Sequence, residues 1–66
     1  MKISINDVAV QLTDGATVQD ALDAKEINPQ GIATALNGTV IPAGSRASKT
    51  LREGDKIVII KAFYGG

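Results

Sequence analysis

The residues best suited to chemistry stand at the end of the chain. The sequence closes with Phe63-Tyr64-Gly65-Gly66, directly after an apolar segment that reaches Ala62. Two glycines form a thin filament, free in φ and ψ, that can pass through a narrow channel and present the carboxylate of Gly66 to a buried active site. This carboxylate is ionised at neutral pH and is a poor electrophile. Attack on the α-phosphate of ATP would convert it into an acyl adenylate, from which a sulfur nucleophile can displace AMP.

A terminal Gly-Gly pair alone is a weak signal. At an average glycine usage of about 7%, it arises by chance in roughly one chain in 200, so it gains meaning from the domain in front of it. Tyr64 either anchors in a partner's pocket, as aromatic residues commonly do at binding hot spots, or folds back on the domain. In the plainest interpretation the glycines are the flexible end of a small binding module.

The rest of the sequence offers little catalytic chemistry. The chain has no Cys and no His, and so lacks a thiolate and an imidazole for nucleophilic, general-base or metal-binding roles. Glu53 and Asp55 flank Gly54, which fits a turn better than a catalytic pair. The hydroxyl groups between positions 45 and 50 have no His to activate them, and the glycines form no phosphate-binding pattern. We therefore expect no catalytic residue, no metal site and no stably bound cofactor.

Length and charge limit the possible partners. A chain of 66 residues buries only about 60% of its unfolded surface, which allows one domain with one modest core. Acidic and basic residues balance at seven each, which argues against nucleic-acid binding. Residues 1–33 are net acidic and residues 34–66 net basic, a division that either steers a partner or reflects solvated faces. Without a signal-peptide or membrane-spanning run, we expect a cytoplasmic protein that is monomeric when free.

The first half of the chain predicts a hairpin and a helix. Residues 2–5 and 8–12 alternate apolar with other residues around Asn6-Asp7, which is typical of two strands joined by a tight turn. Thr17 precedes Asp20 by three positions, the spacing of a capping box at the start of a helix. Lys25 near the helix end suits the helix dipole, and the segment from Asn28 to Gly31 should terminate the helix.

The second half predicts another hairpin and a final strand. Asn37-Gly38 tolerates the positive φ angles of a type I′ turn and should join strands at 32–36 and 39–41. Pro42 ends the second of these strands because it has no N–H group for the ladder. Residues 43–50 are small and polar, which indicates a surface connection. The β-branched run from Ile57 to Ile60 is typical of a central strand.

These elements predict an α+β domain over residues 1–62, followed by a flexible tail over residues 63–66. We expect a mixed sheet of four to five strands with one helix packed across one face. If Ile57 and Ile59 face the helix, Val58 and Ile60 lie on the opposite face and leave apolar surface there. Together with Phe63, at the edge of the core, they form a candidate partner-docking face. The alternative is that the loop over residues 43–50 covers this face.

The order and spacing of these segments resemble those of the ubiquitin-like β-grasp sulfur carriers, and among them the ThiS family of thiamine biosynthesis. The resemblance spans the whole chain. It rests on the opening hairpin, Thr17-Val18 at the helix start, Ala35-Leu36-Asn37 leading to Val40-Ile41-Pro42, the segment from Leu51 to Ile57, and Gly65-Gly66. Two departures are Ala43, where relatives often have a basic residue, and the bulky Phe63-Tyr64 pair before the glycines.

The resemblance implies a set of partners. A ThiF-like adenylating enzyme would activate Gly66 with ATP, cysteine desulfurase-derived sulfur would replace AMP, and a ThiG-like thiazole synthase would receive the sulfur. Gly66 would then be the modified residue, as acyl adenylate and thiocarboxylate, with Gly65 and Tyr64 in the partner's channel. The same ending would also suit a carrier for molybdopterin synthesis, or a modifier whose activated carboxyl passes to a lysine of another protein.

Overall fold

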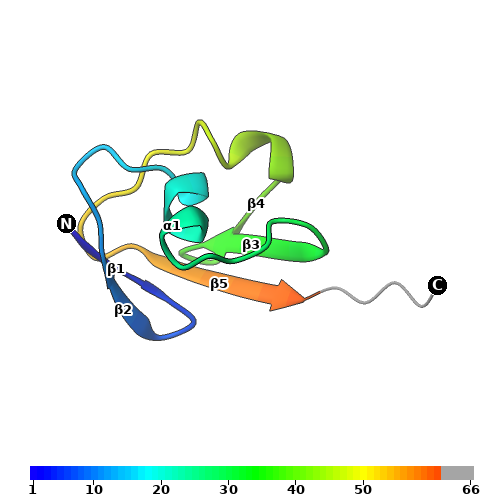
Figure 1. Cartoon of the computed structure of the whole chain (residues 1–66), viewed down its shortest axis with the longest axis horizontal. Helices are drawn as coiled ribbons and strands as arrows, with labels where there is room; N and C mark the ends of the chain where they lie inside the picture. The colour runs from blue at the N-terminus through cyan, green and yellow to red at the C-terminus, as the bar shows by residue number, and fades with distance from the viewer. Residues whose placement is uncertain (62–66) are drawn as a thin grey trace.

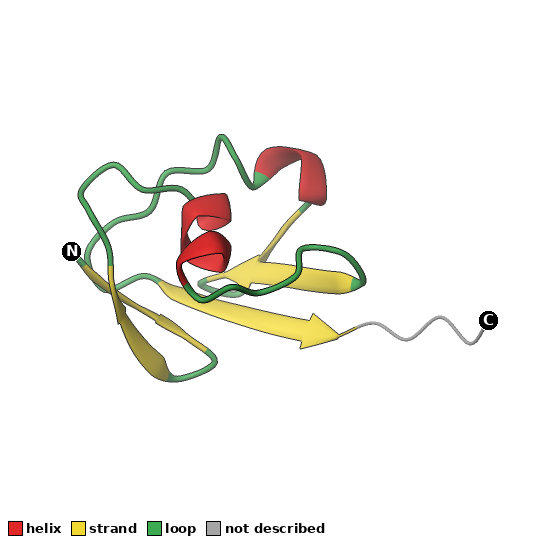
Figure 2. Cartoon of the chain, in the orientation of Figure 1, coloured by secondary structure: helices red, strands yellow, loops and turns green. Residues whose placement is uncertain are grey.

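A computed structural model describes residues 1–61 of the chain, and these residues form two hairpins, a helix and a last strand (Figure 1; Figure 2). The predicted order of elements is confirmed. Among the described residues, no helix is long and apolar enough to cross a bilayer. The elements are β1 (Lys2–Ile5), β2 (Val8–Gln11), α1 (Val18–Ala24), β3 (Ile32–Leu36), β4 (Thr39–Ile41), the 3-10 helix η1 (Ala43–Ser45) and β5 (Lys56–Lys61).

The strands of residues 1–61 form one sheet in the order β2-β1-β5-β3-β4. The two hairpins supply the antiparallel outer pairs, and β5 enters between them, parallel to β1 and antiparallel to β3. The last strand in sequence is therefore the central strand of the sheet, as its β-branched residues predicted. Helix α1 lies across one face of this sheet (Figure 1).

Asparagine occupies the first of the two left-handed positions in each hairpin turn. In the first turn Asn6 and Asp7 have φ angles of 47° and 67°, and in the second Asn37 and Gly38 have φ angles of 50° and 86°. Two consecutive positive φ angles are the signature of the type I′ turn, whose twist matches that of the flanking strands. Both predicted turns are confirmed.

Helix α1 is seven residues long, with side-chain hydrogen bonds at its N-terminal cap and backbone hydrogen bonds at its C-terminal cap. The predicted capping box is confirmed: Asp20 N donates to Thr17 Oγ1 at 3.2 Å and Thr17 N donates to Asp20 Oδ2 at 2.9 Å. The predicted end of the helix was wrong. The helix ends at Ala24, with Lys25 as C-cap and Glu26 in the left-handed region at φ 54°. This bend, and not the segment from Asn28 to Gly31, terminates the helix.

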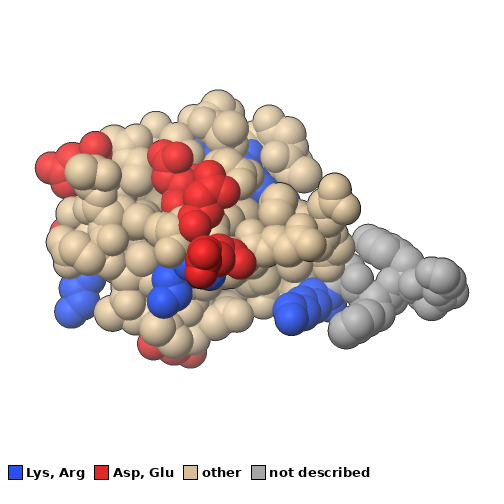
Figure 3. Space-filling view, in the orientation of Figure 1, with Lys and Arg blue, Asp and Glu red and all other residues tan. Residues whose placement is uncertain are grey.

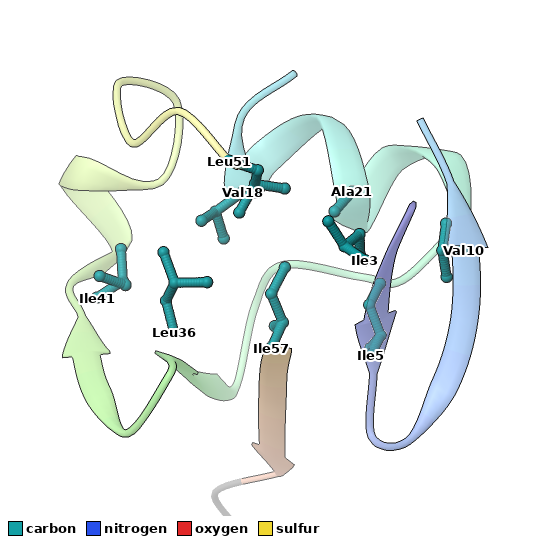
Figure 4. Close-up of a cluster of buried hydrophobic side chains, with 9 residues drawn as sticks. All are labelled: Ile3, Ile5, Val10, Val18, Ala21, Leu36, Ile41, Leu51 and Ile57. Carbon is teal, nitrogen blue, oxygen red and sulfur yellow. The ribbon is translucent and has the colours of Figure 1, made fainter. Parts of the chain in front are cut away.

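The core lies between α1 and the inner face of the sheet (Figure 4). Side chains at alternate positions of the strands reach it, because successive strand residues point to opposite faces. Helix α1 contributes its apolar stripe, and the long connection before β5 adds one leucine. The buried cluster comprises Ile3, Ile5, Val10, Val18, Ala21, Leu36, Ile41, Leu51 and Ile57.

The connection over residues 43–50 packs against the helix. Arg46 O accepts a hydrogen bond from Gln19 N, and Lys49 O accepts one from Val18 N, each at 3.0 Å. The Arg46 side chain is only 4% exposed. The prediction of a plain surface connection was therefore wrong for Arg46, because a guanidinium can be buried where its N–H groups find acceptors.

Candidate functional site: the last strand and the outer face of the sheet

The C-terminal tail follows β5, the central strand of the sheet. It pairs with β1 at two register positions, Ser4–Lys56 and Ile5–Ile57, and with all five residues of β3. Gly66, Gly65, Tyr64 and Phe63 lie outside the described residues, so the roles assigned to them stay predictions. The described residues end at Lys61, the last residue of β5, and the tail continues from there.

Turn asparagines from the two hairpins hold β5 on opposite sides. Asn37 Oδ1 accepts from Lys56 N at 3.0 Å, and the backbone N–H of Asn37 donates to Lys56 O at 2.8 Å. Near the other end, Ile59 N donates to Asn6 Oδ1 at 2.8 Å, and Asn6 Nδ2 donates to Ile59 O at 3.3 Å. These side chains extend the backbone ladders beyond the neighbouring strands and position the strand that carries the tail.

The face of the sheet opposite α1 carries exposed apolar side chains. Val58 is 47% exposed and Ile60 61% exposed, which confirms that both point away from the helix. The register places Ala35 beside both Val58 and Val40, and Ala33 beside Ile60. We call this surface, which spans three adjacent strands, the outer apolar patch. It comprises Ala33, Ala35, Val40, Val58 and Ile60.

The proposed cover for this patch is absent among the described residues. The connection over residues 43–50 lies on the helix side, where it bonds to Val18 and Gln19, and the patch side chains Val40, Val58 and Ile60 remain 69%, 47% and 61% exposed. The alternative that this loop covers the face was therefore wrong. An exposed contiguous apolar surface of this kind is a candidate interaction site.

Charged side chains of both signs are spread over the surface. Figure 3 shows acidic side chains over α1 and also at the left and bottom edges, and basic ones at the lower left, below α1 and near the end of β5. Asp20 and Asp23 belong to the helix and Glu26 follows it, whereas Lys56 and Lys61 begin and end β5.

The polar residues flagged in the sequence have structural roles. Glu53 Oε1 accepts from Lys2 N at 2.9 Å. The Asp55 carboxylate accepts from Arg52 N at 2.8 Å and from Asn37 Nδ2 at 3.0 Å. Asp55 therefore stabilises the turn around Gly54, as predicted, whereas Glu53 ties this turn to the start of β1. Within residues 1–61, no group of three or more acidic side chains is placed to hold a metal ion.

Sequence reasoning missed one buried polar group near the end of β5. The Arg46 guanidinium donates from Nε to Thr34 Oγ1 at 3.2 Å, and from Nη1 and Nη2 to the carbonyl oxygens of Pro29 and Ile32 at 2.9 Å each. It thereby ties the connection after η1 to the segment that enters β3. A single arginine among small polar residues gives no sequence signal of burial, so this contact could be found only in the structure.

A five-stranded mixed sheet in this order, grasping one helix on a single face and leading from its central strand into the C-terminus, defines a ubiquitin-like β-grasp protein. Solved structures with this fold agree. A thiamine biosynthesis protein (ThiS) from Geobacter metallireducens superimposes with a TM-score of 0.80 at 22% identity, covering 100% of this chain and 99% of that one. SAMP1 from Haloferax volcanii gives a TM-score of 0.68 at 21% identity, covering 98% and 97%.

The chain belongs to the ThiS family. The family model matches residues 2–66, a range that includes both terminal glycines. The chain is also 32% identical over 66 residues to the sulfur carrier protein ThiS of Escherichia coli, with 100% of both sequences covered. The family resemblance inferred from the order of segments is confirmed.

Proposed function

We propose that this protein is a sulfur carrier that supplies the thiazole of thiamine. The observation that carries the proposal is the match of the ThiS family model through Gly66, together with full-length similarity to a sulfur carrier protein. The central strand β5 leads into the tail, which supports a protein that presents its terminal carboxylate to enzymes. In this proposal the partner enzyme binds ATP. Because ATP is available in the cytoplasm, we place the protein there.

The chemistry takes place at the carboxylate of Gly66. An oxygen of this group attacks the α-phosphorus of ATP, pyrophosphate leaves, and an acyl adenylate forms on a ThiF-like enzyme. Sulfur at the oxidation level of sulfide, delivered from cysteine by a desulfurase and a thiol reductant, then attacks the acyl carbon. The C–O bond to AMP breaks and a thiocarboxylate remains, with no net oxidation of the glycine carbon. A ThiG-like thiazole synthase receives this sulfur.

The outer apolar patch supports a docking role for the domain. Val58 and Ile60 lie on the strand that leads into the tail, so an enzyme bound there would hold the start of the tail at a fixed distance from its active site. Such docking provides the binding energy, while the glycines enter the channel. Gly65 and Tyr64 then occupy the channel and Gly66 reaches the nucleotide.

Intact-mass spectrometry tests the proposal. The chain is incubated with ATP, a ThiF-like enzyme, a cysteine desulfurase, cysteine and a thiol reductant, next to a matched variant that lacks Gly66. We expect a mass gain equal to replacing one oxygen by sulfur in the full chain and no gain in the variant. An unchanged mass with an enzyme that modifies a control carrier would overturn the proposal.

Two other outcomes would indicate a different function for a protein with the same fold. Isopeptide-linked adducts to lysines of other proteins, without free thiocarboxylate, would indicate a protein modifier. A thiocarboxylated chain that supplies sulfur to a molybdopterin synthase but not to a thiazole synthase would indicate the related carrier.

A further inference from the structure

A concave surface lies at the C-terminal end of β5, on the helix side of the sheet. It is a pocket of about 540 Å³ bounded by the segment that leaves α1, the start of β3 and the last residues of β5. Its apolar lining consists of Ile27, Ile32 and Ile59, all half-buried. Ile27 and Ile59 also pack against the core. Glu26 and Lys61 add charged groups to the lining.

Hydrogen bonds on two sides fix the wall of this pocket. Asn28 Oδ1 accepts from Gln30 N at 3.0 Å, which shapes the loop between α1 and β3. The buried guanidinium of Arg46 holds the same loop through the carbonyl oxygens of Pro29 and Ile32. The pocket is therefore built into the fold, with its apolar floor continuous with the core.

An aromatic residue follows two positions after Lys61, which lines this pocket. Ile57 is buried in the core and Ile59 lines the pocket, so the odd positions of β5 lie on the helix side, and Lys61 also lines the pocket. The next odd position is Phe63. Two residues of extended chain span at most about 7 Å, so the Cα atom of Phe63 cannot lie farther than that from the Cα atom of Lys61.

We propose that Phe63 of the chain's own tail occupies this pocket in the free protein. A side chain tethered two residues away has a high effective concentration at the site, and an aromatic ring buries a large apolar surface against three isoleucines. The alkyl stem of Lys61 can cover the ring while its ammonium group stays in water. This assignment places Phe63 on the helix side, opposite the outer apolar patch with which the sequence analysis grouped it.

Docking at Phe63 shortens the free part of the tail. Tyr64, Gly65 and Gly66 then leave the domain from a fixed point, so an enzyme that threads them orders fewer residues and loses less conformational entropy. This consequence rests on the proposed function, whereas the docking itself concerns only the free chain. An experiment can therefore disprove the docking of Phe63 without disproving the proposed function, and the reverse.

Nuclear magnetic resonance of the full 66-residue chain tests the docking without any enzyme. We expect nuclear Overhauser effects between the Phe63 ring and the methyl groups of Ile27, Ile32 and Ile59. In the variant Phe63→Ala these methyl resonances should move, because the ring current is lost. In the matched variant Tyr64→Ala, which removes the neighbouring aromatic ring, they should stay in place.

Three results would overturn the proposal. One is the absence of ring-to-methyl contacts in the wild-type chain together with unmoved methyl resonances in Phe63→Ala. Another is contact of the Phe63 ring with methyl groups of Val58 or Ile60, which would place it on the outer face. The last is an equal displacement of the pocket methyl resonances in Tyr64→Ala, which would show that the pocket does not select Phe63.

Discussion

Asn6 and Ile59, 53 positions apart in the sequence, are joined by the same pair of hydrogen bonds that a neighbouring strand would supply. Strand β1 ends at Ile5, so β5 would lose its neighbour on this side beyond Ile57. The amide of Asn6 replaces that neighbour at one further residue. A turn residue thus extends the support of β5 to within two positions of its end.

Replacing Asn6 should loosen the end of β5. Asn6→Gly keeps the φ of 47° without strain but removes the amide, and we expect a loss of about 1 kcal/mol in the free energy of unfolding. Asn6→Ala should lose about 1 kcal/mol more, because alanine is strained in the left-handed region. Chemical denaturation measures both values. Hydrogen exchange at Ile59 N–H should accelerate in both variants, and unchanged exchange there would contradict a bracing role.

Local patterns predicted most of the fold because they are set by neighbouring residues. The two turns need positive φ at Asn6 and Asn37, and the alternation from Ile57 to Ile60 divides the two faces of the sheet. The burial of Arg46 could not be predicted in this way. Its acceptors come from Thr34 and from the carbonyl groups of Pro29 and Ile32, and a carbonyl group is present at every position of every sequence.

The candidate site, like the fold, was predicted only where local sequence patterns determine it. Exposure of Val58 and Ile60 followed from strand alternation, whereas the extension of the patch to Val40 depends on the register of β3 with both β4 and β5. The helix end was misplaced because Asn28-Pro29 is a strong stop signal, while Glu26 is an unusual residue for a left-handed bend.

Removing the Arg46 guanidinium should destabilise the domain. Arg46→Met keeps an unbranched apolar stem but leaves the carbonyl oxygens of Pro29 and Ile32 without their donor, so we expect a loss of about 2 to 3 kcal/mol. Thermal or chemical unfolding measures the change. Arg52→Met is the matched control, since the Arg52 side chain is exposed, and it should stay within about 0.5 kcal/mol of wild type. Equal losses of unfolding free energy in both variants would show that the positive charge, and not the buried hydrogen bonds, accounts for the lost stability.

Glycine at position 26 should stabilise the helix end. Glu26 N donates to Asp23 O at 3.0 Å and Ile27 N donates to Leu22 O at 2.9 Å, the pair of bonds that defines a Schellman motif. The motif requires the positive φ of Glu26, which costs every residue except glycine. Glu26→Gly should therefore exceed Glu26→Ala by about 0.5 to 1 kcal/mol in unfolding free energy. The alanine variant removes the same carboxylate, so a difference of zero would rule out relief of strain.

A charge in the outer apolar patch should impair activation and leave the fold intact. Val58→Glu changes a side chain that is 47% exposed, so we expect thermal stability near that of wild type. If an adenylating enzyme docks on this patch, the buried carboxylate would lower kcat/KM for adenylation at least tenfold, which corresponds to about 1.4 kcal/mol.

Val8→Glu is the matched control for this experiment. Val8 is 56% exposed, but it pairs with Ile5 on the edge hairpin and so lies outside the patch. Pyrophosphate release, measured with each variant as substrate for a ThiF-like enzyme, should be slowed by Val58→Glu and unaffected by Val8→Glu. Equal rates for the two variants would mean that the enzyme recognises the tail without the outer face.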